Sequence, residues 1–211
     1  MKTIYLIRHG ESEGNASAIR LDEATGLTDR GRAQAAAVAE RCAKLPVEAL
    51  VASAFERARQ TAEIIGKKIG REPEYSDLFV ERRFPSDFIG KPKEDPAVLK
   101  SVAEMHEGRG VPGYRFSDEE IYEDLKDRAG HALDYLANHA ADHILVVTHG
   151  FFMRIMAAHI LLGEEMTRQE YARVIGKFSM NNAGISVFKY DTENKFAAWH
   201  INTWNDRAHL G

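Results

Sequence analysis

Residues 6–15 (LIRHGESEGN) bring together side chains that could bind an anion and attack it. An apolar run ends at Arg8 and His9, so a strand would deliver both side chains to one loop. Gly10 allows the backbone to approach a ligand closely, and Asn15 can donate hydrogen bonds. These residue types predict an anion-binding loop that contains a histidine nucleophile. The alternative is a surface loop in which Arg8 and His9 are merely solvated.

Two further segments carry a basic residue to the start of a helix. Residues 53–62 (SAFERARQTA) follow an apolar run and open a helix, so Arg57 would lie near free N–H groups that attract an anion. Residues 146–150 (VVTHG) place His149 and Gly150 at the end of another apolar run. The alternatives are an ordinary surface charge for Arg57 and a helix-capping histidine for His149.

The elements that would position these residues alternate strand and helix along the chain. Apolar runs at 3–7, 47–52 and 143–148 are each followed by a loop and a helix. This pattern predicts a three-layer α/β/α fold, with a mostly parallel central sheet and helices on both faces. Functional residues collect beyond the carboxyl ends of the strands in such sheets, where both His9 and His149 would fall.

Capping signals and turn residues place the remaining elements. The spacing predicts a helix over 29–44 and another helix that begins at a capping box formed by Ser117 and Glu120. Alternating and aromatic residues predict two closing strands, over 185–190 and 196–203.

The least regular stretch covers residues 82–113 and holds four of the six prolines of the chain. Irregular segments of this length lie over functional sites more often than inside a core. We expect the stretch to be an insertion that selects the substrate, and Arg82, Arg83 and Lys91 are its candidate contacts.

Composition narrows the class of protein. The 211 residues, 44% of them hydrophobic, fit one globular domain that spans 1–211. The net charge of -4, with 28% charged residues of mixed sign, provides no basic stripe for a nucleic acid and no polybasic membrane anchor. The N-terminal apolar run, Ile4–Ile7, is too short for a signal-peptide core or a membrane span, so we expect a cytoplasmic protein. The sequence indicates no oligomeric state.

The sequence gives no support to a metal centre. Cys42 is the only cysteine, which excludes an internal disulfide and a CxxC metal cage. His139 and His143 are spaced i,i+4 but lack the glutamate placement of a zinc protease motif. We therefore expect neither a metal ion nor another cofactor at the site.

Several motifs in a fixed order resemble those of one known family. The chain is similar to the histidine phosphatase superfamily, also called the phosphoglycerate mutase-like family, over essentially its whole length. The motifs that carry the resemblance are RHGES at 8–12, GLTDRGRAQA at 26–35, SAFERARQTA at 53–62, Glu81, VTHG at 147–150 and NDRAHL at 205–210.

The resemblance implies phosphoryl transfer, in which neutral His9 attacks phosphorus through one ring nitrogen while a backbone carbonyl holds the other. Positive charge and hydrogen-bond donors would surround the phosphoryl group, which would make a metal ion unnecessary. The residues matched to this binding role are Arg8, Asn15, Arg57, His149 and Gly150.

Glu81 matches the proton donor of the family, whose carboxyl must stay protonated beside the phosphate dianion. The alternative for Glu81 is a surface ion pair with Arg82 or Arg83.

The first functional hypothesis is therefore a metal-independent phosphomonoesterase that hydrolyses a small phosphorylated metabolite through a phosphohistidine on His9. Two alternatives remain open. One is a phosphotransferase of the phosphoglycerate mutase type, and the other is a catalytically weak regulatory protein that binds phosphoproteins.

Overall fold

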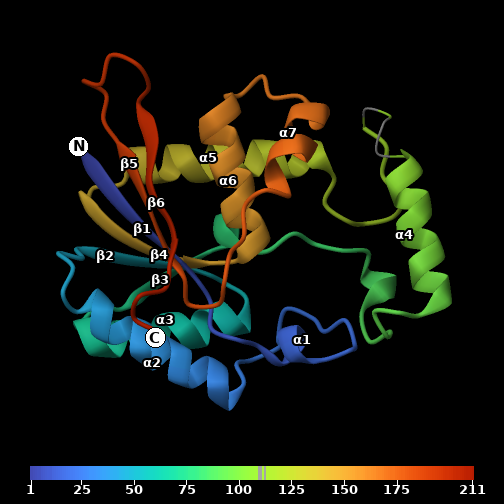
Figure 1. Cartoon of the computed structure of the whole chain (residues 1–211), viewed down its shortest axis with the longest axis horizontal. Helices are drawn as coiled ribbons and strands as arrows, with labels where there is room; N and C mark the ends of the chain where they lie inside the picture. Colours follow the sequence, from blue (N-terminus) through green and yellow to red (C-terminus); the bar gives the residue numbers. More distant parts are fainter. Residues whose placement is uncertain (109–110, 112) are drawn as a thin grey trace.

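The strands of the chain form one six-stranded sheet in the computed structural model, which describes residues 1–108, 111 and 113–211 (Figure 1). The strand order is β3-β2-β4-β1-β5-β6, in which the first four strands run parallel and the last two pair antiparallel. The strands are β1 (Lys2–Arg8), β2 (Ala49–Ser53), β3 (Pro73–Ser76), β4 (His143–Thr148), β5 (Ile185–Tyr190) and β6 (Trp199–Asp206). The predicted α/β fold is confirmed.

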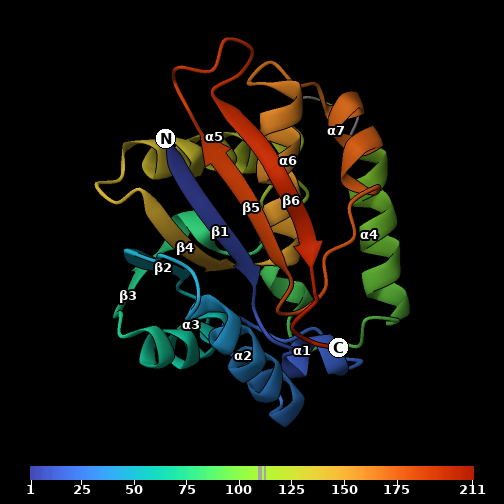
Figure 2. The same ribbon diagram turned by 60° about the vertical axis from the view of Figure 1, so that its left-hand side comes forward.

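Helices cover both faces of the sheet, as Figures 1 and 2 show. Successive side chains of β1 point to opposite faces, because strand residues alternate. Ile4 and Leu6 join the core beneath one helix pair, and Tyr5 and Ile7 join the core beneath the other. The first pair is α5 (Tyr122–Asn138) with α6 (Gly150–Leu162), and the second is α2 (Asp29–Cys42) with α3 (Glu56–Ile69).

The remaining helical segments belong to neither helix pair. In both ribbon views α4 (Pro96–Gly108) stands at the margin of the molecule, next to α7 (Arg168–Ile175) and away from the sheet. Val98 and Met105 of α4 form a small core of their own with Phe88. These elements are α1 (Glu13–Ala16), α4 (Pro96–Gly108), α7 (Arg168–Ile175) and the 3-10 turns η1 (Asp77–Phe79) and η2 (Ser86–Phe88).

The expected insertion, 82–113, is tied to the loop that follows β1. Arg20 donates its backbone N–H to Lys91 O at 3.0 Å, and Lys93 Nζ donates to Gly14 O at 3.0 Å. The irregular stretch therefore lies beside the anion-binding loop predicted from the sequence. Three of its residues, at 109, 110 and 112, lie outside the described part of the chain.

The helix expected at Ser117 begins later, at Tyr122. The predicted capping box does not form, because the carboxylate of Glu120 instead binds Arg128, with the Arg128 Nε at 2.8 Å. Ser117 donates its backbone N–H to the neighbouring carboxylate of Glu119, at 2.8 Å. Other hydrogen bonds of Ser117 and Glu120 therefore take the place of the predicted capping box.

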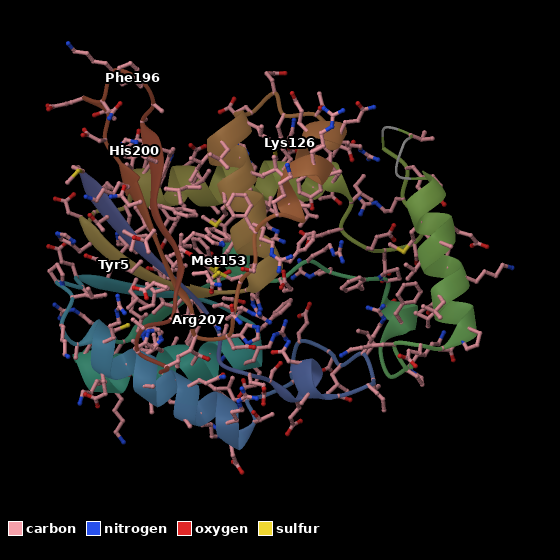
Figure 3. The ribbon with its side chains drawn as sticks, in the orientation of Figure 1. Tyr5, Lys126, Met153, Phe196, His200 and Arg207 are labelled. Atoms are coloured by element: carbon pink, nitrogen blue, oxygen red, sulfur yellow. The ribbon has the colours of Figure 1, made fainter. Side chains whose placement is uncertain are left out.

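The closing strand also begins later than the predicted 196–203. Asn194 Oδ1 accepts the backbone N–H of Phe196 at 2.9 Å and of Ala197 at 3.3 Å, which extends the turn. β6 starts only at Trp199. Phe196 stands at the tip of this connection and is 98% exposed (Figure 3).

Within the described residues, no helix is both long enough and apolar enough to cross a membrane. The expected cytoplasmic location stays a prediction.

Candidate active site

His9 follows β1 directly and is buried, with 3% of its surface exposed. Its Nδ1 lies 2.6 Å from the carbonyl oxygen of Gly10. Because a carbonyl only accepts, this contact assigns the ring proton to Nδ1 and leaves the lone pair on Nε2. Burial, followed by the charges of Arg57 and Arg8, holds the pKa of His9 well below its usual 6.5. The ring is therefore neutral at pH 7, with Nε2 available as a nucleophile.

His149 lies beside His9, because β1 and β4 are parallel neighbours and both histidines follow the carboxyl ends of these strands. The two ring centroids are 4.9 Å apart. His149 is fully buried, and burial, with the charge of Arg57 next, holds its pKa well below 6.5 as well. The sheet therefore brings the two histidines together at its carboxyl edge, as the sequence predicted. His149 is a neutral imidazole there, so it provides a hydrogen bond and not the positive charge expected of it.

Ser53, at the end of β2, orients His149. The hydroxyl Oγ of Ser53 accepts the backbone N–H of Phe55 at 3.2 Å and lies 2.8 Å from Nε2 of His149. Among the described residues, Nε2 is the acceptor within reach of the hydroxyl proton, so we assign the proton of the ring to Nδ1. This Nδ1 is buried and has no partner in the described part of the chain, so it can donate to a ligand.

Arg8 and Arg57 add positive charge to the two histidines. Arg57 lies in the first turn of α3, and its guanidinium carbon lies 5.1 Å from the centre of the Phe55 ring. Arg8 donates from Nη1 to the carbonyl of Met180, and its buried Nε has no partner among the described residues. Burial lowers the pKa of both arginines, and the charge of Glu81 opposes that effect. Both guanidiniums remain cations that an anion could bind.

Gly150 is the first residue of α6 and packs against Arg8. A Cβ added at Gly150 would lie 3.1 Å from Cδ and Nε of Arg8. The glycine therefore leaves room for the guanidinium between the helix start and β1.

Glu81 lies at the N-terminus of α6, where backbone N–H groups lack helical partners. Its Oε2 accepts the N–H of Phe151 at 3.2 Å, and its Oε1 accepts the N–H of Phe152 at 3.1 Å. Oε1 also accepts the N–H of Arg82 at 3.0 Å. Three backbone donors thus hold the carboxyl group next to the arginine cluster.

Asn15 lies in α1, with its Oδ1 engaged inside the loop. This oxygen accepts the Ser12 backbone N–H at 3.1 Å and the side-chain amide of Asn182 at 3.2 Å. The same Asn182 nitrogen donates to His9 O at 3.0 Å. Asn15 therefore supports the loop that carries His9, through a residue that the sequence analysis did not single out.

Arg154 is a second residue near the site that the sequence analysis did not predict. It lies one helical turn after Gly150, on the same face of α6. Burial has the largest effect on the pKa of Arg8 and lowers it, the charge of Glu81 raises it, and the charge of Arg154 lowers it further. Its buried Nε has no partner among the described residues. The i,i+4 spacing from Gly150 was the available signal.

Two of the three residues expected to select the substrate, Arg82 and Arg83, take different positions, and the third, Lys91, accepts the backbone N–H of Arg20. Arg82 lies between two aromatic rings, 4.3 Å from the centre of Phe84 and 4.2 Å from that of Phe151. Arg83 forms an ion pair with Glu23, with Nε and Oε1 3.2 Å apart. Only Arg82 is in direct contact with the residues that hold Glu81.

No group of three or more histidine, cysteine, aspartate or glutamate side chains in the described chain could hold a metal ion. The single cysteine, Cys42, is the last residue of α2 and is buried, and burial raises the pKa of its thiol to about 12.

The comparison with known proteins agrees with this geometry. The sequence profile of the histidine phosphatase superfamily (branch 1) matches residues 4–207. Phosphoglycerate mutase-like protein 4 of Arabidopsis thaliana is 30% identical over 215 residues, which cover 98% of this chain and 86% of the plant protein.

Two solved structures share the fold. YhfR of Bacillus stearothermophilus superposes with a TM-score of 0.82 at 22% identity, and the match covers 100% of both chains. The alpha-ribazole phosphatase of Shigella flexneri has a TM-score of 0.78 at 20% identity, and the match covers 98% of this chain and 97% of that one.

Proposed function

The chain belongs to the histidine phosphatase superfamily (branch 1), and from this premise we propose that it is a metal-independent phosphomonoesterase acting on a small phosphorylated metabolite. The observation that carries the proposal is the 2.6 Å hydrogen bond from His9 Nδ1 to Gly10 O. It leaves Nε2 of a buried, neutral ring as the nucleophile.

In the proposed first step, Nε2 of His9 attacks phosphorus and the ester P–O bond breaks. Arg8, Arg57 and the Nδ1–H group of His149 would neutralise the phosphoryl oxygens, because the transition state spreads negative charge over them. The product is a phosphohistidine and a free alcohol. A metal ion is not needed for charge neutralisation when two guanidiniums supply it.

Glu81 would supply the proton that the leaving oxygen takes up. A phosphate dianion next to the Glu81 carboxyl favours its protonated form, since two neighbouring negative charges repel. After proton transfer, the carboxylate would take a proton from the water that attacks the phosphohistidine on His9. The second step releases inorganic phosphate and restores both residues.

The plant relative carries a mutase-like name, and this favours a second candidate function. A phosphoglycerate mutase-type enzyme would return the phosphoryl group of His9 to a second hydroxyl of the substrate instead of to water. Appreciable interconversion of 2- and 3-phosphoglycerate would place this function first.

The test is hydrolysis of para-nitrophenyl phosphate in the presence of EDTA, with the wild type compared with His9→Ala. We expect metal-independent turnover that falls at least about 1,000-fold in the variant, because the nucleophile is removed. His131→Ala is the matched control, since His131 is exposed on α5, and it should keep wild-type turnover. Absent wild-type activity, or equal activity in His9→Ala, would refute the proposal.

A further inference from the structure

A cavity of about 930 Å³ opens beside the phosphoryl site. Among the described residues, its walls come from 82–84, from Met105 of α4, from Tyr114, from the start of α5, from Phe151 of α6 and from α7. Neither of the two site histidines lines it, so the cavity is distinct from the phosphoryl site. Its volume lies in the range that encloses organic ligands of drug size.

The cavity meets the phosphoryl site at Glu81. Arg82 and Phe151 both line the cavity, and both donate their backbone N–H to the Glu81 carboxylate, at 3.0 and 3.2 Å. A proton donor must lie beside the leaving oxygen of the ester. The carbon skeleton attached to that oxygen would therefore lie next to the cavity and could extend into it.

The cavity wall is mainly apolar and aromatic. Side chains from five separate segments contribute to it, so the apolar character does not depend on one element. The apolar residues that carry the argument are Phe84, Met105, Leu125, Phe151, Tyr171 and Ile175.

The acidic side chains in the wall have partners within the protein. The Glu120 carboxylate receives two hydrogen bonds from Arg128, at 2.8 and 2.9 Å, and both side chains are nearly buried. Glu123 is bound by Arg168, whose Nε lies 2.9 Å from Oε1. The carboxylate of Glu119 accepts backbone N–H groups on both oxygens.

The cations in the wall are also engaged. Arg168 binds Glu123, and Arg83 binds Glu23 with Nε and Oε1 3.2 Å apart. Arg82 lies between the faces of two aromatic rings. Among the residues that the structure describes, three arginines and three glutamates line the cavity, and the formal charges of these six cancel.

We propose that this cavity binds the leaving alcohol of the substrate, and that the substrate class is the phosphomonoesters of bulky, uncharged, apolar alcohols. The inference rests on the proposed phosphatase function and names its substrate class. A neutral apolar skeleton loses little hydration when it enters this wall. A carboxylate on the alcohol, such as that of phosphoglycerate, would lose its hydration without gaining a dedicated cation.

The first experiment compares kcat/KM for three alkyl esters whose leaving alcohols have the same kind of oxygen. They are ethyl phosphate, 2-(2-naphthyl)ethyl phosphate, and the naphthylethyl ester with a carboxylate on the distal ring. We expect the naphthylethyl ester to exceed ethyl phosphate by about 100-fold, because remote apolar contacts contribute to transition-state binding. The carboxylate should lower that value by at least about tenfold.

The second experiment fills the cavity. Ala172 is a small, exposed residue of α7 that lines it, so Ala172→Trp should lower the naphthylethyl to ethyl ratio of kcat/KM by about tenfold. Arg173→Trp is the matched control, since Arg173 is exposed on the same helix and does not line the cavity. This control should keep the wild-type ratio.

The outcomes separate the inference from the function on which it rests. Hydrolysis that depends on His9 but shows no preference for the naphthylethyl ester would overturn the substrate class alone. An equal effect of Ala172→Trp and Arg173→Trp, or a preference for the carboxylate-bearing ester, would overturn it too. Hydrolysis that does not depend on His9 would instead overturn the proposed function.

Discussion

His9 and His149 lie side by side and share the Nδ1–H tautomer, yet their hydrogen-bond partners leave opposite ring nitrogens free: Nε2 of His9 and Nδ1 of His149. The carbonyl of Gly10 holds the proton of His9 on Nδ1, and the hydroxyl of Ser53 directs the lone pair of His149 to Nε2. One ring therefore presents an acceptor atom to the site, while the other presents an N–H donor. One hydrogen bond to each ring therefore gives the two histidines different roles, one as a nucleophile and the other as a hydrogen-bond donor.

Ser53→Ala tests this assignment. Without the hydroxyl proton, His149 should populate the Nε2–H tautomer. The value of kcat/KM should then fall by about tenfold, because the Nδ1–H group that donates a hydrogen bond to the phosphoryl oxygens is lost. Two-bond ¹H–¹⁵N NMR of the imidazole rings reports the tautomer directly. Ser186→Ala controls for loss of a buried hydroxyl, since Ser186 lies in β5 and is also fully buried. An unchanged His149 tautomer in Ser53→Ala would show that Ser53 only fills space.

Glu81→Gln tests the proton donor through the leaving group. An aryl ester expels a stable phenolate and should keep nearly its wild-type rate, whereas an alkyl ester should lose at least about 100-fold, because its alkoxide needs a proton. The measurement is kcat for phenyl and ethyl phosphate in both proteins. An equal loss on the two esters would contradict the assigned role.

At the scale of elements, the loop after β1 is shaped by the start of α2. A Cβ added at Gly31 would lie 1.9 Å from the carbonyl oxygen of Glu11, so the backbones touch there. Thr28 caps the helix by accepting the Gly31 N–H at 3.0 Å and donates to the Glu11 carboxylate at 3.0 Å. This helix start therefore holds the loop that carries His9 in place.

Gly31→Ala should consequently destabilise the protein by at least about 2 kcal/mol, since the methyl group would force two backbone segments apart. Urea unfolding monitored by circular dichroism measures the change. Gly176→Ala is the control, because Gly176 has an ordinary φ of -72° and no atom lies within 4 Å of an added Cβ. Equal stability of Gly31→Ala and the control would show that the contact is relieved elsewhere.

At the scale of the whole molecule, folding buries the two site histidines in their neutral form, and this makes the free energy of unfolding depend on pH. The folded pKa values of His9 and His149 lie well below 6.5, so the unfolded chain binds protons first as the pH falls. Their stabilising contribution is complete above pH 6.5 and decreases below it, by up to about 1.4 kcal/mol per pH unit for each histidine.

The free energy of unfolding should therefore fall between pH 7 and pH 5. Carboxyl groups with lowered pKa values, such as Glu48 and Asp206, lose their contribution only at lower pH, through and below their usual range near 4. Urea unfolding across this window measures the slope. His149→Gln should reduce it, and His131→Gln, at an exposed position, should not. A slope that is the same in His149→Gln would contradict the link.

Local sequence patterns were enough to predict the sheet edge at which the candidate site residues lie. Local periodicity defines the buried strands that end before His9 and His149, and parallel strands bring their carboxyl ends to one edge. Arg8 and Arg57 follow from the same logic, because each is adjacent to a strand end or opens a helix. The ordered motifs also identified the family, which the profile match confirmed.

Tertiary structure alone decided how these residues are held and what lies beside them. Ser53 and His149 are 96 positions apart, and Asn182 lies 173 positions from the His9 carbonyl that it binds. The cavity beyond Glu81 likewise combines side chains from segments far apart in the chain. Such contacts carry no local period or cap, so only the packing of elements onto the sheet creates them.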